Sequence, residues 1–535
     1  MVADLPPVSP SRSMEAPFGF AGSEACGTYK LQAPAASALA ALVSPAAYAS
    51  FCRASSSAVL PHLFMAGTNA ADQHSNQLHV VGYVEETCEV ECSCRLVHPP
   101  EVHALALLPS LGGSELTSLS PDHEETGATE AREASNADNG EGDAAREERP
   151  RETLSFFTAF PDQNTRYAAD RCVLWRSSVD FPSPAVSLLD AEEEEESLPS
   201  SRSAASLHRP SIVSELKSSQ SRFQPIRKLV VPRGDPDDVL GSATAGGREP
   251  QLLVMMEGSC ELFKATESSF ESCALLPADP HHRYTAVTFD HHHPHTIVAA
   301  EAREDALGGM NVFGSGGSLR IFDLREKTNA RRCGAESPAG KRDAHAVNPH
   351  GRLAAPLSID FNPNLSFSFV SGASDGCVAY WDGRTLQRPL QVLRDVHSHW
   401  VTSVSFNAFH DQLLLTASTD NTVKLHHAET LSVRRSPLSS SLLRGGEKRR
   451  ELDAFSAESE SGAEAGAGGG DSPENAKKGW RDSSSEIVYS YEGGEDSVVA
   501  VAWAAHEAWA CAALTAEGCI SFHQVPPKEK YRILL

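Results

Sequence analysis

Residues Ser371–Arg384 read SGASDGCVAYWDGR, and 16 residues later Trp400–His427 read WVTSVSFNAFHDQLLLTASTDNTVKLHH. Each stretch contains an apolar strand, a Ser/Thr-rich step, a turn with an Asp, and a second strand of alternating apolar and polar residues. A unit of this size that occurs twice in succession indicates a repeat architecture, in which neighbouring units bury their apolar faces against one another. Such an architecture is more often a binding platform than a catalyst.

The unit has the form of a WD40 repeat, and seven copies can be traced along the chain. Period-two alternation between turns predicts half-buried strands, and three of them at hairpin spacing predict an antiparallel blade. The clearest copies open at Ala286–Asp290, Pro356–Pro363, Ser403–Phe409 and Val499–His506, and weaker ones cover residues 63–83, 101–176 and 228–265. We therefore predict an all-β fold, a seven-bladed WD40 β-propeller, because a closed ring removes exposed sheet edges. Tyr531–Leu535 is expected to add an outer or closing strand, with Phe18–Leu31 contributing to the same closure.

The chain is longer than seven blades require. It has 535 residues, 40% of them hydrophobic, and a formal charge of −25 that is concentrated in polar tracts such as Glu192–Glu196. These tracts cannot bury enough apolar surface to offset chain entropy. We expect a disordered tail at 1–17 and one propeller over 18–535, with disordered acidic inserts at about 111–152, 183–224, 326–346 and 435–485.

Composition also limits the classes of function. The negative charge disfavours nucleic-acid binding. The lack of a long apolar run disfavours direct membrane insertion. The 12 cysteines show no pairing rhythm, which favours a cytoplasmic protein with reduced thiols. No signature of a nucleotide-binding loop, hydrolase, metalloprotease or kinase is present. We therefore expect no catalytic residues, no cofactor and no small-molecule substrate. The cluster His281, His282 and His291–His293 suits a polar loop better than a metal site, so no metal is expected either.

Several residues match the signature positions of a WD40 blade. Such a blade contains a buried network of hydrogen bonds between four residues. They are an Asp in the turn after the second strand, a Trp on the third strand, a Ser or Thr on the second strand and a His before the first strand. Asp375 lies six residues before Trp381, with Ser371 and either His345 or His350 as partners. The next blade has Asp420 and either Thr416 or Ser418, with His426 at the Trp position. The preceding blade has Phe322 there, and the last has Glu517 and His523. We interpret Asp375, Trp381, Asp382, Asp420, Phe322 and Asp323 as determinants of the fold.

Two third strands end in similar tetrapeptides, Phe322–Arg325 (FDLR) and Trp381–Arg384 (WDGR). Their form is similar to the WDxR motif of WD40 proteins that dock onto the adaptor of the cullin-4 ubiquitin ligase. Arg325 and Arg384 are therefore candidate partner-binding residues, and a substrate receptor of that ligase is one alternative function. The simpler interpretation is that each arginine covers the edge of its own blade.

Beyond these repeats, the run Asp395–His427 resembles the family of EARP- and GARP-complex-interacting WD40 proteins. The resemblance extends to SIDFNPN (Ser358–Asn364), HSHWV (His397–Val401), HDQLLLT (His410–Thr416), the ending Tyr491–Leu535, and Met65–Val81 near the start. It covers residues 284–325 and 350–535, apart from the insert within the latter. The inserts at 111–152 and 183–224 depart from the compact form of that family.

The resemblance implies a non-enzymatic scaffold that binds the EARP and GARP tethering complexes and supports endosomal recycling and transport from endosomes to the Golgi. It would lie in the cytoplasm, peripheral to the trans-Golgi network and recycling endosomes. The best candidates for partner contact are His397, His399 and Trp400, although a Trp just before a first strand can also be a packing residue. The alternatives are the cullin-4 receptor and a histone- or chromatin-binding propeller, which acidic loops would favour by attracting basic tails.

Overall fold

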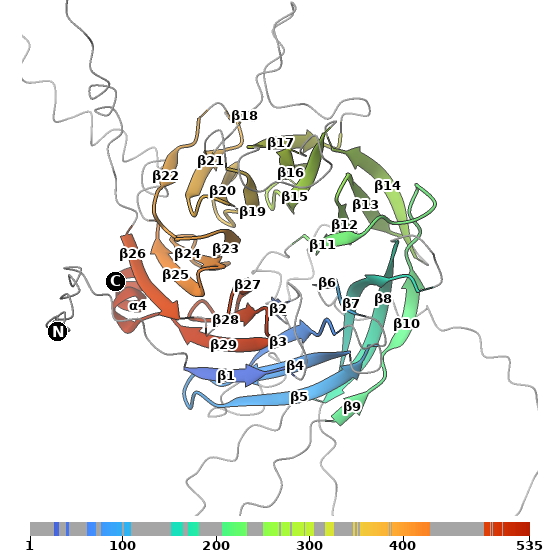
Figure 1. Ribbon diagram of the computed structural model, residues 1–535. Helices are drawn as coiled ribbons and strands as arrows, with labels where there is room; N and C mark the ends of the chain where they lie inside the picture. The colour runs from blue at the N-terminus through green and yellow to red at the C-terminus, as the bar shows by residue number, and fades with distance from the viewer. Residues whose placement is uncertain are drawn as a thin grey trace, which may run out of the picture.

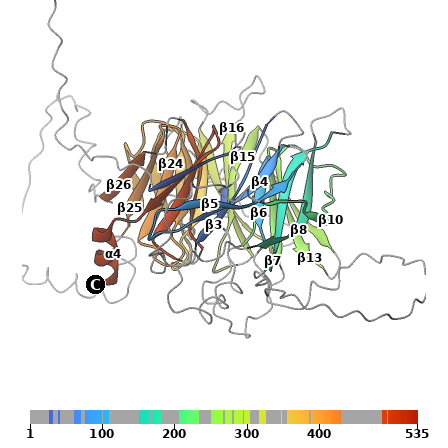
Figure 2. The same ribbon diagram turned by 90° about the horizontal axis from the view of Figure 1, so that it is seen from below.

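Seven sheets, antiparallel except for one parallel edge pair in the first blade, are arranged in a ring in the computed structural model (Figure 1). The structure describes residues 26–31, 39–41, 61–70, 76–98, 101–108, 151–163, 169–180, 206–232, 250–266, 269–278, 281–293, 295–303, 316–325, 346–347, 350, 354–384, 386, 388–428, 486–492, 494, 496–505 and 507–535. Seen from the side, the strands of the blades run across the thickness of the ring (Figure 2). The predicted seven-bladed propeller is confirmed.

The first three blades are built from residues before 280. The first has the order β2 (Leu39–Ala41), β3 (His62–Gly67), β4 (Gln77–Tyr83), β5 (Val90–Val97) and β9 (Ser206–His208). The second has the order β6 (Ala104–Leu107), β7 (Arg151–Pro161), β8 (Asp170–Asp180) and β10 (Ser211–Glu215). The third has the order β11 (Ile226–Val230), β12 (Gln251–Met256), β13 (Ser259–Ala265) and β14 (Phe270–Pro277).

The remaining four blades contain the clearest repeats. The fourth has β15 (His282–Phe289), β16 (Thr296–Arg303), β17 (Gly317–Asp323) and β18 (Ala346–Val347). The fifth has β19 (Pro356–Phe361), β20 (Ser368–Ala373), β21 (Val378–Asp382) and β22 (Gln391–Leu393). The sixth has β23 (Val401–Phe406), β24 (Leu413–Ser418), β25 (Thr422–His427) and β26 (Glu486–Glu492). The seventh has β27 (Val498–Trp503), β28 (Ala510–Thr515), β29 (Cys519–Gln524) and, from the other end of the chain, β1 (Gly27–Lys30).

The N-terminal strand closes the ring, and the C-terminal segment does not. β1 pairs antiparallel with β29, with Gly27 opposite Phe522, so the expected N-terminal contribution to closure is confirmed for Gly27–Lys30. The strand expected at Tyr531–Leu535 is wrong, because Pro527–Leu534 form the helix α4. The edge of β29 is already paired with β1. Proline in the first turn and Glu529 near the positive N-terminus favour a helix.

The insert predicted at 183–224 is wrong over its second half. β10 pairs with β8, and β9 adds a parallel fifth strand to β5 of the first blade. Phe223 is buried in the core between the second and third blades. The Ser- and Glu-rich composition before residue 206 obscured this short alternating segment, which is ordered by the edges of β5 and β8. The tail at 1–17, the inserts at 111–150, 326–345 and 435–485, and His345 lie outside the described residues.

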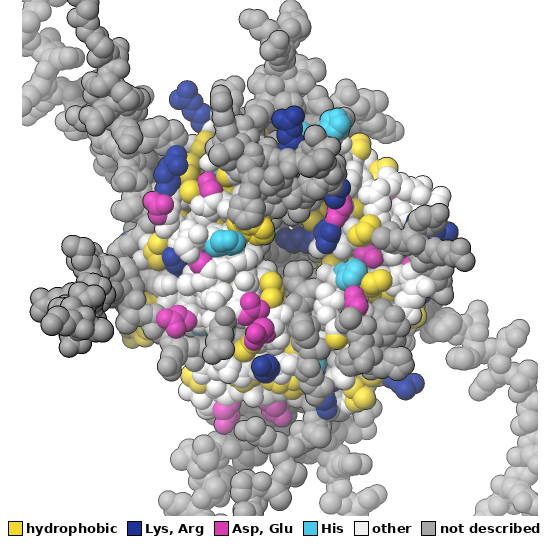
Figure 3. Space-filling view, in the orientation of Figure 1, with side chains coloured by type: hydrophobic (Ala, Val, Ile, Leu, Met, Phe, Trp, Pro, Cys, Tyr) yellow, Lys and Arg dark blue, Asp and Glu magenta, His cyan; other side chains and the backbone are white. Residues whose placement is uncertain are grey.

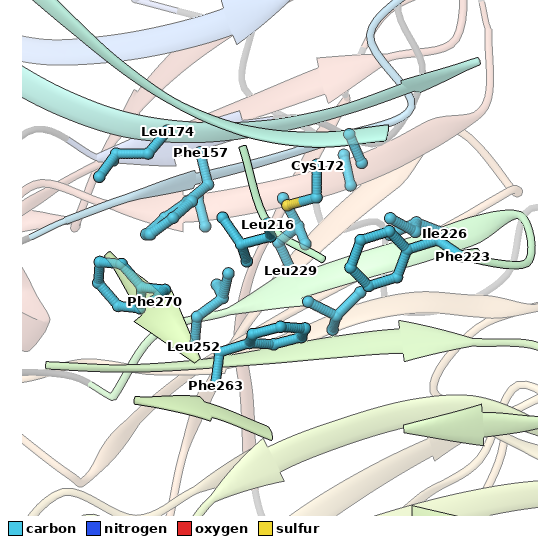
Figure 4. Packing of buried hydrophobic residues seen from close by; sticks show 14 of the residues in the cluster. Phe157, Cys172, Leu174, Leu216, Phe223, Ile226, Leu229, Leu252, Phe263 and Phe270 are labelled. Carbon is cyan, nitrogen blue, oxygen red and sulfur yellow. The ribbon is translucent and has the colours of Figure 1, made fainter. Parts of the chain in front are cut away.

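Apolar side chains fill the wedges between neighbouring blades. Between the second and third blades, Phe157 of β7 meets Phe270 of β14 edge to face, with ring centroids 5.0 Å apart (Figure 4). Leu252 and Phe263 extend the same cluster across the third blade. Each blade thus buries its apolar surface only against its neighbours, so stability depends on completing the ring. Among the described residues, no helix is long and apolar enough to cross a bilayer.

Candidate functional site

The sixth blade has the most complete hydrogen-bond network at the signature positions. His397 Nδ1 lies 3.0 Å from Asp420 Oδ2, and His397 Nε2 lies 2.8 Å from Thr416 Oγ1. Thr416 Oγ1 lies in turn 2.9 Å from His426 Nε2. The carboxylate can only accept, so His397 donates from Nδ1 and accepts at Nε2 from the Thr416 hydroxyl. His426 then donates its Nε2 proton to Thr416, and so replaces the indole N–H of the usual tryptophan.

The fifth blade has the same core of contacts with a tryptophan. Trp381 Nε1 donates to Ser371 Oγ over 2.8 Å, and Ser371 Oγ lies 2.7 Å from His350 Nε2. Asp375 does not complete this network as expected. It is exposed and accepts from the backbone N–H of Cys377, and His350 Nδ1 has no hydrogen-bond partner within the described part of the chain. Asp375 therefore shapes the turn between β20 and β21, while Ser371 connects the side-chain rings of His350 and Trp381.

A third network lies in the second blade, where the sequence pattern was weak. Trp175 Nε1 donates to Thr158 Oγ1 over 2.7 Å, and His98 Nε2 lies 2.9 Å from the same oxygen. Thr158 and Trp175 are 17 residues apart, whereas the corresponding residues of the fifth and sixth blades are ten apart. The long β7–β8 hairpin and the insert before it hide the motif. A search for His, Thr and Trp with variable spacing would have found it.

The fourth blade replaces the network with an ion pair. Phe322 is buried and cannot donate a hydrogen bond. Arg320 Nη1 instead lies 2.6 Å from the buried carboxylate of Glu301, and its guanidinium lies 4.8 Å from the centre of the Phe322 ring. Breaking such a buried pair would leave an uncompensated charge. The pair and the ring therefore hold this blade together without the usual signature.

Burial lowers the pKa of several histidines of the described residues. The pKa falls to about 4 for His79, His350 and His523, and to about 3 for His426. These groups stay neutral in the fold but take up protons near pH 6.5 when the chain unfolds. Their stabilising contribution is therefore present above pH 6.5 and is lost as the pH falls toward their folded pKa values.

We therefore expect the free energy of unfolding to fall between pH 6.5 and pH 4.5, with each such histidine adding roughly 1 kcal/mol per pH unit to the slope. Urea denaturation across this range measures it. His103, whose pKa Asp170 raises, opposes the trend weakly. Glu85, whose pKa is lowered to about 2 by a hydrogen bond with His62, acts only at lower pH. A His426→Gln variant should have a shallower slope than the wild type. A flat profile would contradict the assignment.

The candidate partner residues of the HSHWV segment divide into buried and exposed. His397 is only 4% exposed and is committed to Asp420 and Thr416, so its assignment as a partner contact is corrected to a role in the network. His399 is exposed and hydrogen-bonds to Thr419. Trp400 is partly exposed, and its ring stacks on that of His399 with centroids 5.3 Å apart. We call residues 396–400 the rim loop.

The rim loop is held from several sides. The backbone N–H of His397 donates to Gly376 O over 3.1 Å, and that of Thr419 donates to Trp400 O over 3.1 Å. The backbone N–H of Ser398 donates to Asp420 Oδ2 over 3.0 Å. A loop fixed in this way loses little conformational entropy when a partner binds. The loop therefore holds the exposed His399 and the partly exposed Trp400 in one fixed arrangement.

Arg325 and Arg384 have nearly identical surroundings. Each donates from Nε and Nη2 to both carboxylate oxygens of the Asp two residues earlier, Asp323 or Asp382, over 2.8–3.0 Å. The side chains remain 66% and 60% exposed. This short-range clamp lowers the pKa of Asp323 to about 2 and raises that of Arg384. The arginines are thus held by their own turns while their outer edges face solvent.

These arginines lie on the opposite face of the propeller from the rim loop. β20 leads into the turn at Gly376, which contacts the rim loop, and β21 returns across the ring to Asp382. The two groups of candidate residues therefore cannot form one site. On the face in Figure 3, acidic, basic and histidine side chains of the described residues are interspersed, with no field of one sign.

One trio of described residues has ligand atoms close enough to hold a metal. The atoms of His62, Glu85 and Glu507 lie within 4.8 Å of one another. Lys530 of α4 already pairs with Glu85, however, and supplies the positive charge there. The trio therefore serves as a charged contact between the first blade, the seventh blade and α4.

In the loop between β15 and β16, His293 Nδ1 lies 2.9 Å from Asp290, which also accepts from the backbone N–H groups of His292 and His293.

Comparison with known proteins agrees with this fold. Residues 310–426 match the family model described as the EIPR1 beta-propeller. The EARP and GARP complex-interacting protein 1 of Rattus norvegicus is 35% identical over 188 residues, which are 35% of this chain and 42% of that protein. Over these residues the chain is similar to this family. The human protein of the same name is 34% identical over the same shares. The EARP-interacting protein homolog of Danio rerio is 37% identical over 293 residues, or 54% of this chain and 62% of that protein.

The matched region thus spans about two fifths of the rat and human relatives. The family-model match, over residues 310–426, includes the fifth blade and most of the sixth, with the rim loop and both arginine clamps. These relatives are named for an interaction and not for a reaction. Together with the propeller fold, the match supports a WD40 interaction scaffold.

Proposed function

We propose that this protein is a non-enzymatic WD40 scaffold that binds an EARP- or GARP-type tethering complex and acts in endosomal recycling and endosome-to-Golgi transport. The observation that carries the proposal is the family match over residues 310–426 to proteins named for that interaction. Its site of action would be the trans-Golgi network and recycling endosomes.

We propose the rim loop as the contact surface. The aromatic rings of His399 and Trp400 stack on each other on one face of the propeller, and the loop beneath them is fixed by backbone hydrogen bonds. Aromatic side chains on a rigid support are typical of the few residues that dominate binding energy at an interface. Networks at three signature positions stabilise the blades that carry such loops, and none of them leads to a reactive centre.

The proposal predicts that a His399→Ala/Trp400→Ala double variant recovers at least roughly tenfold less tethering complex than the wild type, since truncating central aromatics costs about 1.4 kcal/mol or more. The measurement is affinity purification from cells followed by quantitative mass spectrometry. An Arg325→Ala/Arg384→Ala variant, which is altered on the opposite face of the propeller, should recover as much complex as the wild type. Thermal unfolding of both variants checks that they fold.

Two outcomes would support other functions. Recovery of the cullin-4 adaptor without tethering subunits, lost in the arginine variant, would support the ligase receptor. Its basis is the matching exposed clamps of Arg325 and Arg384. Recovery of histones alone would support a chromatin-binding propeller. Either result would overturn the tethering proposal.

A further inference from the structure

Two cysteines meet where the ring closes. Cys26 directly precedes β1, and its backbone N–H donates to Phe522 O over 2.9 Å. Cys88 lies in the turn between β4 and β5 of the first blade, in a left-handed conformation with φ of 57°. A methyl group placed on Gly27 would lie 3.2 Å from Cys88 O, so the two backbones adjoin. The closing strand of the seventh blade therefore touches the first blade through this pair.

The two thiols have the same polar neighbours, Tyr83 and Gln524. The side chains of Cys26 and Cys88 lie within interaction distance of each other. The Tyr83 hydroxyl donates to Cys88 Sγ over 3.8 Å, and Gln524 Nε2 lies 3.9 Å from the same sulfur. Gln524 also donates to the Tyr83 hydroxyl over 2.8 Å. Both cysteines are exposed and carry free thiols.

We propose that Cys26 and Cys88 form an oxidisable pair whose disulfide fastens the closing strand β1 to the first blade. Among the described cysteines, this pair connects the seventh blade to the first blade, at the point where the propeller closes. The proposal concerns a modification site and does not depend on the partner of the rim loop.

The chemistry assigns different roles to the two thiols. Partial burial, and after it the neighbouring Cys88, raise the pKa of Cys26, which disfavours Cys26 as the first thiol to react with an oxidant. With a peroxide as oxidant, the Cys88 thiolate attacks an oxygen and breaks the O–O bond, which gives a sulfenic acid and hydroxide. The Cys26 thiolate then attacks that sulfur and displaces the second hydroxide. The two thiol protons convert both hydroxides to water, and the peroxide takes two electrons.

A disulfide here would act on the element whose loss opens the ring. β1 has only four residues and pairs with β29 alone. A cross-link over a long loop restricts the unfolded chain and keeps this short strand in place. Oxidation is therefore expected to raise the unfolding temperature of the whole protein by roughly 5 °C.

The test uses the full chain treated with a small excess of hydrogen peroxide, then alkylated and digested without reductant. We expect one linked peptide pair containing Cys26 and Cys88, which dithiothreitol separates, and a raised unfolding temperature. Cys26→Ser and Cys88→Ser should lack both effects, while Cys273→Ser, which alters another exposed thiol, should retain both. Circular dichroism of the reduced variants checks folding.

Three outcomes would overturn the proposal. The first is recovery of Cys26 and Cys88 alkylated or singly oxidised, with no linked peptide. The second is a linkage of either cysteine to another one, such as Cys92. The third is formation of the Cys26–Cys88 link without any change in unfolding temperature, since the bond would then not hold the closure.

Discussion

Replacing Gly376 by alanine is expected to lower the free energy of unfolding by about 3 kcal/mol or more. Gly376 has φ of +76°, a conformation that costs a residue with a Cβ atom about 1–2 kcal/mol. A Cβ there would also lie 2.1 Å from the carbonyl oxygen of His397. That neighbour is backbone of the rim loop and cannot move without breaking the His397–Gly376 hydrogen bond. Urea denaturation of the wild type and the variant measures the loss.

The matched control is Gly383→Ala, at the other end of β21. The nearest atoms to a Cβ at Gly383 lie 3.4 Å away, which is ordinary contact, and its φ is not positive. We expect this change to cost less than about 1 kcal/mol. Equal effects of the two substitutions would show that the close approach at Gly376 does not govern the rim loop. Because Gly376 supports that loop, its variant should also reduce recovery of the tethering complex.

Replacing Thr416 by valine is expected to cost about 2–4 kcal/mol of unfolding free energy. Valine keeps the shape but removes the hydroxyl that joins His397 Nε2 to His426 Nε2. Thr416, His397 and His426 are all buried, at 0%, 4% and 0% exposure, so water does not readily replace the lost partner. Thermal and urea unfolding measure the effect.

Thr416→Ser keeps the hydroxyl and loses only a methyl group, so it should cost about 1 kcal/mol. If valine and serine had equal effects, packing and not the hydrogen-bond chain would account for the stability at this position. The Thr416→Val variant should also loosen the rim loop, since His397 lies at its base. Hydrogen exchange of the Ser398 and His399 amides would rise before the rest of the sixth blade is affected.

Much of the ring could be predicted because each blade is a local unit. Period-two alternation and turn residues located β19–β21 and β23–β25 closely, since antiparallel hairpins pair neighbouring segments of chain. The same reasoning found β12 and β13 despite their weak signature. It missed β9 and β10, because their hydrogen-bonding partners lie far away in sequence. It also predicted a strand at Tyr531–Leu535, because an apolar run does not show whether a sheet edge is free to receive it.

The candidate site was less predictable for a related reason. The position of Asp375 six residues before Trp381 led to the network of Ser371 and Trp381, which lie ten residues apart, but Thr158 and Trp175 lie 17 residues apart and were missed. His397 and His399 are two residues apart and look equivalent in sequence. One is buried against Asp420 and the other faces solvent. Only the path of the loop across the turn at Gly376 separates these roles.

By itself, the sequence determined the repeat, the number of blades and the resemblance to a known family, because strand periodicity, turn residues and segments such as HSHWV are local properties of the chain. The tertiary structure decided which residues close the ring, that β1 and not the C-terminus pairs with β29, and that Cys26 meets Cys88. It also placed the rim loop and the two arginine clamps on opposite faces of the propeller. These facts depend on contacts between distant segments, which form only when all seven blades pack into one ring.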